Sequence, residues 1–132
     1  MFIETIHPRF AETDALGHIN NTVVPVWLEQ ARTPVFRLFI PDLDIKQWRL
    51  IIAKIEVNFW QEILYGHEVK VHTYIEKIGN SSFQVGQEVH QREQLCAKGR
   101  SVMVHFDYAT RKAQPIPTEI RKKMEAHYVA AD

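Results

Sequence analysis

Residues 9–40 decide the fold, and they read RFAETDALGHINNTVVPVWLEQARTPVFRLFI. The first part, up to Asn21, is dense in polar and turn-forming residues and predicts a loop. From Thr22 to about Ile40 the apolar residues recur at spacings of three and four, which is typical of one face of a helix. Pro34 falls inside this helix, where a proline removes a backbone hydrogen bond, so we expect a kink or an early end there. The apolar face comprises Val24, Trp27, Leu28, Ala31, Val35 and Leu38.

Strand patterns flank this helix on both sides. Residues 2–8 alternate and end at Pro8, which predicts a short strand. From Leu50 the period changes to two, which predicts a half-buried strand through Phe59. One helix followed by a run of antiparallel strands indicates an α+β fold in which the helix lies across one sheet, and the uncovered face or edge of that sheet invites a partner. Further strands are expected at residues 69–75, 83–89 and 95–106, with turns at 79–80 and 107–111 and a short helix at 117–127.

The composition limits the function. With 132 residues the chain is long enough for one domain, spanning residues 1–132, and too short for two. Its 16 basic residues balance 16 acidic ones, so no net field attracts nucleic acid or an anionic membrane. A single cysteine, Cys96, excludes an internal disulfide framework, and no apolar run approaches the roughly 18 residues of a membrane span. A cytoplasmic location is the default expectation.

The loop before the helix carries the chemistry. It places two carboxylates, Glu12 and Asp14, and a chain-reversing Gly17 directly ahead of the helix start, which Asn20, Asn21 or Thr22 can cap. A helix start exposes unpaired backbone N–H groups and the positive end of the helix dipole, which stabilise a developing oxyanion. A carboxylate folded back over this end would face the same point. A nucleophile and oxyanion donors could then bracket one carbonyl carbon.

This arrangement suits a thioester better than an amide or a phosphate ester. A thiol leaving group has a pKa of about 8.5 and departs as the thiolate with little help from an acid. What remains is to deliver a nucleophile and to polarise the carbonyl. Asp14 can do the first, by direct attack or as a base on water. The backbone N–H groups near Asn21 and Thr22 can do the second, at about 3–4 kcal/mol for one well-placed donor.

Motifs along nearly the whole chain match one known family in the same order. They are Arg9, Glu12, Asp14, Gly17, His18, Asn20 and Asn21, then residues 27–32, 57–59, 65–69, 78–83 and 115–117. In these motifs the chain resembles the 4-hydroxybenzoyl-CoA thioesterase family of hot-dog fold acyl-CoA thioesterases. The resemblance implies a long central helix wrapped by a five- or six-stranded antiparallel sheet. It also implies a homodimer or homotetramer with an active site for acyl-CoA at the subunit interface.

The resemblance assigns roles to individual residues. Asp14 falls at the position of the catalytic carboxylate in part of this family, and the amide near Asn21 falls at its carbonyl-polarising position. Another branch of the hot-dog fold uses a carboxylate on the helix, so Glu29 is a reserve candidate for the base. From the residues alone, Asp14 could instead be a turn residue that bonds its own backbone. His18 is expected to hold Asp14 or a water, or to be a satisfied loop histidine.

The substrate is expected to contact the loop, the helix and the strands. A cationic rim for the phosphates of coenzyme A is expected from Lys98, Arg100, Arg111 and Lys112, which lie on or after the last long strand. Aromatic side chains are expected to line an acyl pocket unless they belong to the core. Glu12 is expected to be a structural partner of Arg9. The other substrate-binding candidates are Thr22, Trp27, Asn58 and Phe59.

Two other functions stay open at this point. A hot-dog hydratase or dehydratase would need Asp14 and His18 to act together on the β-carbon of an acyl thioester, whereas a non-catalytic acyl-binding module would need neither. The seven histidines lack His-Glu-x-x-His or another metal spacing, so we expect no metal and no other cofactor. The acyl group, the choice between coenzyme A and an acyl carrier protein, and the nucleophile or base role of Asp14 are left open.

Overall fold

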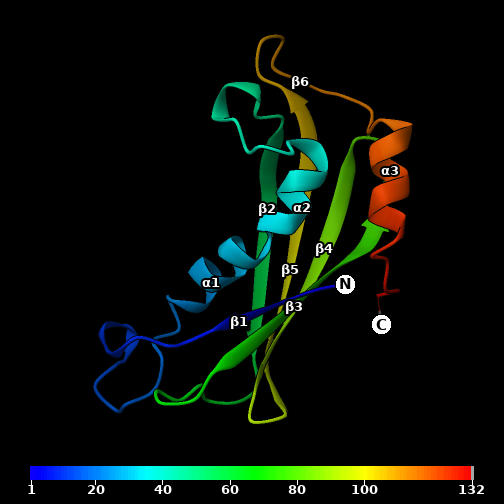
Figure 1. Cartoon of the computed structure of the whole chain (residues 1–132). Helices are drawn as coiled ribbons and strands as arrows, with labels where there is room; N and C mark the ends of the chain where they lie inside the picture. Colours follow the sequence, from blue (N-terminus) through cyan, green and yellow to red (C-terminus); the bar gives the residue numbers. More distant parts are fainter. Residues whose placement is uncertain (132) are drawn as a thin grey trace.

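The computed structural model describes residues 1–131, and it contains one curled, six-stranded antiparallel sheet. The strands are β1 (Phe2–Ile6), β2 (Leu50–Phe59), β3 (Val69–Ile78), β4 (Ser82–Gln91), β5 (Gln94–Asp107) and β6 (Lys112–Ala113). They follow the order β1-β3-β4-β5-β2, and β6 pairs with β5 (Figure 1). The expected α+β arrangement, with one long helix across one antiparallel sheet, is confirmed.

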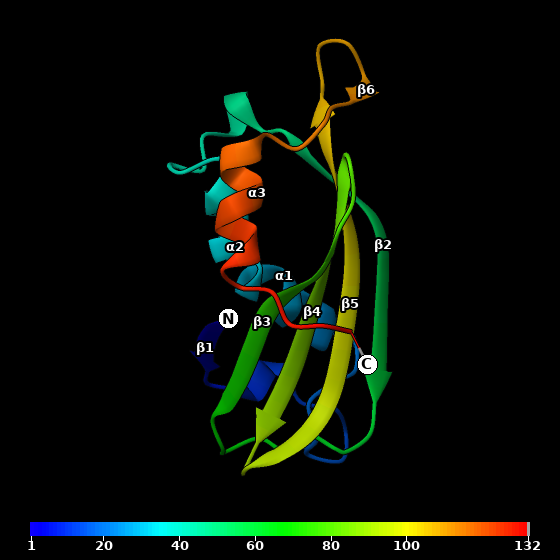
Figure 2. The ribbon, with the colours of Figure 1, turned by 90° about the vertical axis from the view of Figure 1, so that its right-hand side faces the viewer.

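The long helix is bent in the middle. It consists of α1 (Val24–Ala31) and α2 (Thr33–Phe39), which meet at Arg32. Pro34 lies in the first turn of α2, where its missing N–H costs little. The kink expected at this proline is therefore confirmed. Both helices and α3 (Thr118–Glu125) lie on the concave side of the sheet (Figure 2).

A buried polar network ties the bend to the sheet. Gln87 of β4 donates a hydrogen bond to the Leu28 carbonyl at 2.9 Å and accepts one from Arg32 Nη1 at 3.3 Å. Thr73 of β3 donates to the Ala31 carbonyl at 3.3 Å. Burial lowers the pKa of the Arg32 guanidinium from its ordinary value. The helix therefore crosses the sheet in one fixed position, which also fixes where it begins.

Two hydrophobic clusters fill the space between helices and sheet, one under α1 and one under α2 and α3. Gly99 of β5 allows α1 to come close, because a Cβ there would lie 2.7 Å from Leu28 Cδ1. Since Gly99 faces α1, its neighbours Lys98 and Arg100 face the opposite side, the outer face of the sheet. The concave face thus holds the core and the outer face carries charge.

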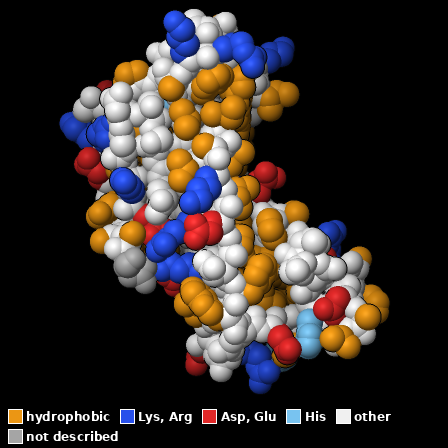
Figure 3. Space-filling model, turned by 180° about the vertical axis from the view of Figure 1, so that it is seen from behind, with side chains coloured by type: hydrophobic (Ala, Val, Ile, Leu, Met, Phe, Trp, Pro, Cys, Tyr) orange, Lys and Arg blue, Asp and Glu red, His pale blue; other side chains and the backbone are white. Residues whose placement is uncertain are grey.

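No helix of the described residues covers the outer face. Figure 3, which views the molecule from behind, shows this face, with Lys and Arg side chains interspersed with Asp and Glu over its middle.

Within residues 1–131, none of the helices combines the length and the apolar character needed to cross a bilayer.

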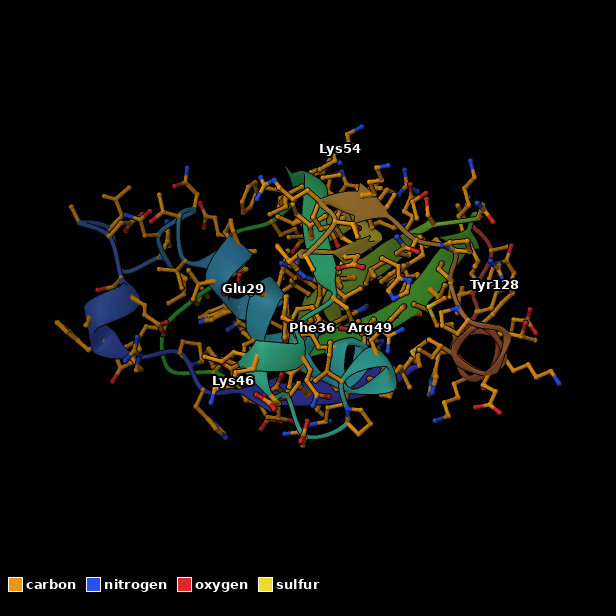
Figure 4. The ribbon with its side chains drawn as sticks, turned by 90° about the horizontal axis from the view of Figure 1, so that it is seen from above. Glu29, Phe36, Lys46, Arg49, Lys54 and Tyr128 are labelled. Carbon is orange, nitrogen blue, oxygen red and sulfur yellow. The ribbon has the colours of Figure 1, made fainter. Side chains whose placement is uncertain are left out.

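The edge strand β2 is more exposed than the sequence predicts. Of its ten residues only Leu50 is buried, whereas Ile55 and Phe59 are 51% and 48% exposed. A bulge between Ile52 and Lys54 shifts its register against β5. Lys54 lies on the opposite side of β2 from α1 and α2 (Figure 4). The expected half-buried strand is wrong for the single chain, because β2 is an edge strand that only β5 pairs within the described residues.

Candidate active site

A buried glutamate anchors the loop to α1. Glu12 is 8% exposed, and its Oε1 accepts a hydrogen bond from the Arg9 backbone N–H at 2.7 Å. Its Oε2 accepts from the indole Nε1 of Trp27 at 3.0 Å and lies 3.6 Å from the Arg9 guanidinium. The expected structural pairing of Glu12 with Arg9 is confirmed. Glu12 therefore sets the position of the loop, and it does so through Trp27 on the helix.

The carboxylate of Asp14 has one bound oxygen and one free oxygen. Oδ1 accepts hydrogen bonds from the backbone N–H groups of Leu16 at 2.7 Å and His18 at 3.1 Å. Gly17, with φ +81°, supplies the left-handed conformation that closes this turn. Within residues 1–131, Oδ2 has no hydrogen-bond partner, and Asp14 is exposed. Asp14 can therefore stabilise the turn through Oδ1 and still offer Oδ2 as a nucleophile or base, because the two roles use different oxygens.

Backbone N–H groups at the helix start, among them that of Asn21, have no partner within residues 1–131. Asn20 Oδ1 accepts from the Thr22 backbone N–H at 3.0 Å and from its hydroxyl at 2.9 Å. The residue at the N-cap position is Val23, without a side-chain cap. The expected cap by Asn20, Asn21 or Thr22 is therefore wrong: the side chain of Asn20 closes the turn before the helix and does not cap the helix itself. The Thr22 N–H is occupied, whereas the Asn21 N–H has no partner among the described residues.

A cavity of about 590 Å³ joins these groups. One wall comes from the Asp14 loop and the start of α1, and the other from the end of β2 and the segment that follows it. Phe59 and Trp60 are 48% and 56% exposed, so this second wall is largely open to solvent. The lining residues are Asp14, His18, Ile19, Asn20, Asn21, Val24, Phe59, Trp60, Gln61, Glu62 and Ile63.

The comparisons with known proteins agree with this geometry. Residues 8–124 match the sequence profile described as the thioesterase-like superfamily. The chain belongs to this superfamily. A solved structure described as a predicted thioesterase from Bacillus stearothermophilus is 47% identical, covers 99% of this chain and 98% of its own, and superposes with a TM-score of 0.96. The expected hot-dog fold is confirmed, while membership of the 4-hydroxybenzoyl-CoA branch within it stays a prediction.

Two further relatives of this thioesterase-like protein come from other bacteria. A thioesterase from Thermus thermophilus, solved in complex with coenzyme A and Zn, is 31% identical over 94% of this chain and 91% of its own, with a TM-score of 0.83. The protein YsmA of Bacillus subtilis (strain 168) is 25% identical over 113 residues, which are 85% of this chain and 77% of YsmA.

Of three expected substrate contacts in this thioesterase-like chain, Phe59 lines the cavity, whereas Trp27 and Thr22 do not. Phe59 lines the cavity as expected. Trp27 does not: it is 3% exposed, and its indole N–H is used by Glu12, so it belongs to the core. Thr22 adjoins the lining residue Asn21 without lining the cavity itself. The sequence therefore predicts that the helix start lies at the cavity, but it does not predict which side chains of the helix line the cavity.

Three other expected contacts lie on the outer face, away from the cavity. Asn58 pairs in register with Lys98, and both neighbours of Gly99 point away from α1. Arg100 Nε lies 3.4 Å from the buried carboxylate of Glu76. The structure does not bring these residues to Asp14 within one chain. The contact of Lys98 and Arg100 with the phosphates of coenzyme A remains a prediction, as does the contact of Asn58 with the substrate.

His18 lines the cavity together with Asp14, but its imidazole is paired with another residue, and Glu29 lies outside this cavity. The imidazole Nε2 of His18 lies 3.2 Å from Glu62 Oε2, so it is directed to Glu62 and not to the carboxylate of Asp14. Glu29, the reserve base, lies on α1 in a different groove of about 420 Å³, with Ile52 and Ile55 (Figure 4). Sequence reasoning missed Gln61, Glu62 and Ile63 in the cavity wall, because the irregular segment after β2 shows no periodicity that reveals its direction.

Proposed function

We propose that this protein is an acyl-CoA thioesterase that hydrolyses an acyl-CoA to the free acid and coenzyme A, with Asp14 as the nucleophile or general base. One observation carries the proposal: the same cavity is lined by Asp14, whose Oδ2 is free, and by Asn21, whose backbone N–H is free within residues 1–131. The relative solved with coenzyme A, at 31% identity, supports this carrier.

The chemistry follows from these two groups. The thioester carbonyl oxygen accepts a hydrogen bond from the Asn21 N–H at the positive end of α1, which stabilises the oxyanion as it forms. Asp14 Oδ2 either attacks the carbonyl carbon, giving an acyl anhydride that water then cleaves, or takes a proton from the water that attacks. In both routes the C–S bond breaks, coenzyme A leaves as the thiolate, and one water supplies the oxygen and the protons.

A second copy of the chain completes the site in this proposal. The edge of β2 exposes Ile51, Ile52 and Ile55, and next to them the cavity wall exposes Phe59 and Trp60. A long exposed edge strand with apolar side chains favours pairing with another strand. A homodimer, alone or within a homotetramer, would cover this edge and close the open wall of the cavity.

The decisive experiment measures thiol release from a panel of acyl-CoAs by the parent protein and by Asp14→Asn. Loss of a general base or nucleophile is expected to lower kcat by about 10²–10⁴-fold while binding of the acyl-CoA is retained. Asp42→Asn is the matched control, because Asp42 also accepts a backbone hydrogen bond in an exposed turn, at 3.1 Å from Asp44 N. Near-parental turnover by Asp14→Asn would contradict the assignment.

Two other results would redirect the proposal. Loss of enoyl absorbance without thiol release would indicate a hydratase or dehydratase. Acyl-CoA that stays bound and intact for hours would indicate a binding module.

The variant Asn21→Ala keeps the backbone N–H, so its kcat is expected to stay within about threefold of the parent value. This change is smaller than the fall of about 10²–10³-fold in kcat that follows the loss of one oxyanion donor.

A further inference from the structure

Three side chains with metal-binding atoms meet on the outer face of the sheet, away from the Asp14 cavity. They are His72 of β3 and Glu88 and His90 of β4. His72 is directly opposite Glu88 in the antiparallel register, and His90 follows Glu88 by two residues, so all three point to the same side. Each offers one ligand atom, and these atoms lie within 4.8 Å of one another. We propose that His72, Glu88 and His90 form a binding site for a divalent transition-metal ion of the Zn²⁺ type.

The distances already approach those of a coordinated metal. His90 Nε2 lies 2.9 Å from Glu88 Oε1, and the rings of His72 and His90 are stacked with their centroids 4.5 Å apart. Tetrahedral zinc binds imidazole nitrogen and carboxylate oxygen at about 2.0–2.2 Å, which places neighbouring ligand atoms about 3.3 Å apart. The three ligand atoms, which lie within 4.8 Å of one another, must approach to about this spacing when a metal binds.

A buried tyrosine orients the carboxylate. Tyr74 of β3 is 3% exposed, and its hydroxyl donates a hydrogen bond to Glu88 Oε2 at 2.9 Å. The other oxygen, Oε1, is the one that faces His90. A hydrogen bond to the second oxygen of a ligating carboxylate fixes its orientation, as such outer partners do in metal sites. Tyr74, two residues from His72 on the same strand, therefore fixes the orientation of the Glu88 carboxylate.

The donor set and its neighbours select the class of metal. Two imidazoles and one carboxylate suit Zn²⁺ and its neighbours Co²⁺, Ni²⁺ and Cu²⁺, whereas Mg²⁺ and Ca²⁺ prefer oxygen ligands. Lys70 is opposite His90 in the register and Lys98 is opposite Glu88, so two positive charges flank the cluster. These charges oppose every divalent cation, so binding depends on the affinity of the metal for imidazole nitrogen, which favours the Zn²⁺ class. Three protein ligands leave the fourth position of the metal open to water.

The expectation of no metal rests on the lack of ligands spaced closely along the chain. Here His72 and Glu88 are brought together by strand pairing, and no motif along the chain indicates which residues will be opposite each other. The site is on the other face of the sheet from the catalytic cavity. It therefore stands independently of the proposed hydrolysis.

The test is a Zn²⁺ titration of metal-free protein in competition with a chromogenic chelator, followed by the absorption spectrum of the Co²⁺ form. One ion is expected per chain, with the intense visible bands of four-coordinate Co²⁺. His72→Gln and His90→Gln are each expected to weaken binding at least tenfold. Tyr74→Phe is expected to weaken it about 10-fold or more, as loss of an outer partner does. His7→Gln is the matched control, since His7 is exposed and outside the cluster.

Circular dichroism of each variant confirms that it is folded before its affinity is compared. Binding that is absent, or that falls equally in His7→Gln and in the cluster variants, would overturn the proposal. Asp14→Asn is expected to bind the metal like the parent protein. Failure of the metal site and failure of the thioesterase assignment are therefore distinguishable.

Discussion

The hydrogen bond between Glu12 and Trp27 is expected to hold the loop that carries Asp14 on the helix. It joins Oε2 to Nε1 at 3.0 Å, and the two residues are 8% and 3% exposed. A buried hydrogen bond to a charged group contributes about 1.5–3 kcal/mol, and a buried donor left unpaired costs a similar amount. Glu12→Ala is therefore expected to lower the free energy of unfolding by about 2–4 kcal/mol, a large share of the roughly 5–15 kcal/mol typical of a domain.

A double-mutant cycle isolates this contact. Urea unfolding of the parent, Glu12→Ala, Trp27→Phe and the double variant should give a coupling energy of about 1.5–3 kcal/mol. Glu4 and Gln30 serve as the control pair, because their side chains are joined at 2.9 Å but the bond is exposed, so their coupling should be close to zero. Equal coupling in the two pairs, or a Glu12–Trp27 coupling below about 0.5 kcal/mol, would refute this account of the loop.

Three further predictions concern the core and its titrating groups. Gly99→Ala should lower the free energy of unfolding by about 1–3 kcal/mol in urea melts, because its Cβ would lie 2.7 Å from Leu28 Cδ1, whereas an unchanged midpoint would show that α1 can move away. Burial raises the pKa of the Cys96 thiol, so a thiol reagent at neutral pH should label it only after denaturation; rapid labelling of the native protein would contradict this. Burial, and then the N-terminal charge, lower the pKa of His127 below its ordinary 6.5. The unfolded chain thus binds more protons, stability falls as the pH drops below about 6.5, and His127→Gln should reduce that slope in melts from about pH 7 to pH 5.

The fold follows from the sequence where local chemistry decides it. The spacing of Val24, Trp27 and Leu28 predicts the helix, and Pro34 predicts its bend, because both effects act within one turn. The exposure of β2 could not be predicted, because alternation shows that a strand has two faces and not whether anything covers them. The helix start differs for a similar reason: Asn20, Asn21 and Thr22 are all polar, and only the path of the loop puts Val23 at the N-cap and leaves Asn20 to close the preceding turn.

The site was predictable to the extent that it is built from contiguous residues. Asp14 and Asn21 belong to one loop and one helix start, and the structure brings both to one cavity. Lys98 and Arg100 are different, because the face they occupy depends on Gly99, which packs against α1 in a contact between distant segments. The second cavity wall around Glu62 and the cluster at His72 likewise depend on chain segments that meet only in the fold.

The most direct test of the central claim is a crystal structure of Asp14→Asn with an unhydrolysed acyl-CoA bound. The thioester oxygen is expected to lie about 2.7–3.1 Å from the backbone nitrogen of Asn21, within reach of an oxyanion donor. The carbonyl carbon is expected to lie about 3–3.5 Å from the side chain at position 14. A thioester bound elsewhere, for example in the groove beside Glu29, would contradict the proposed function.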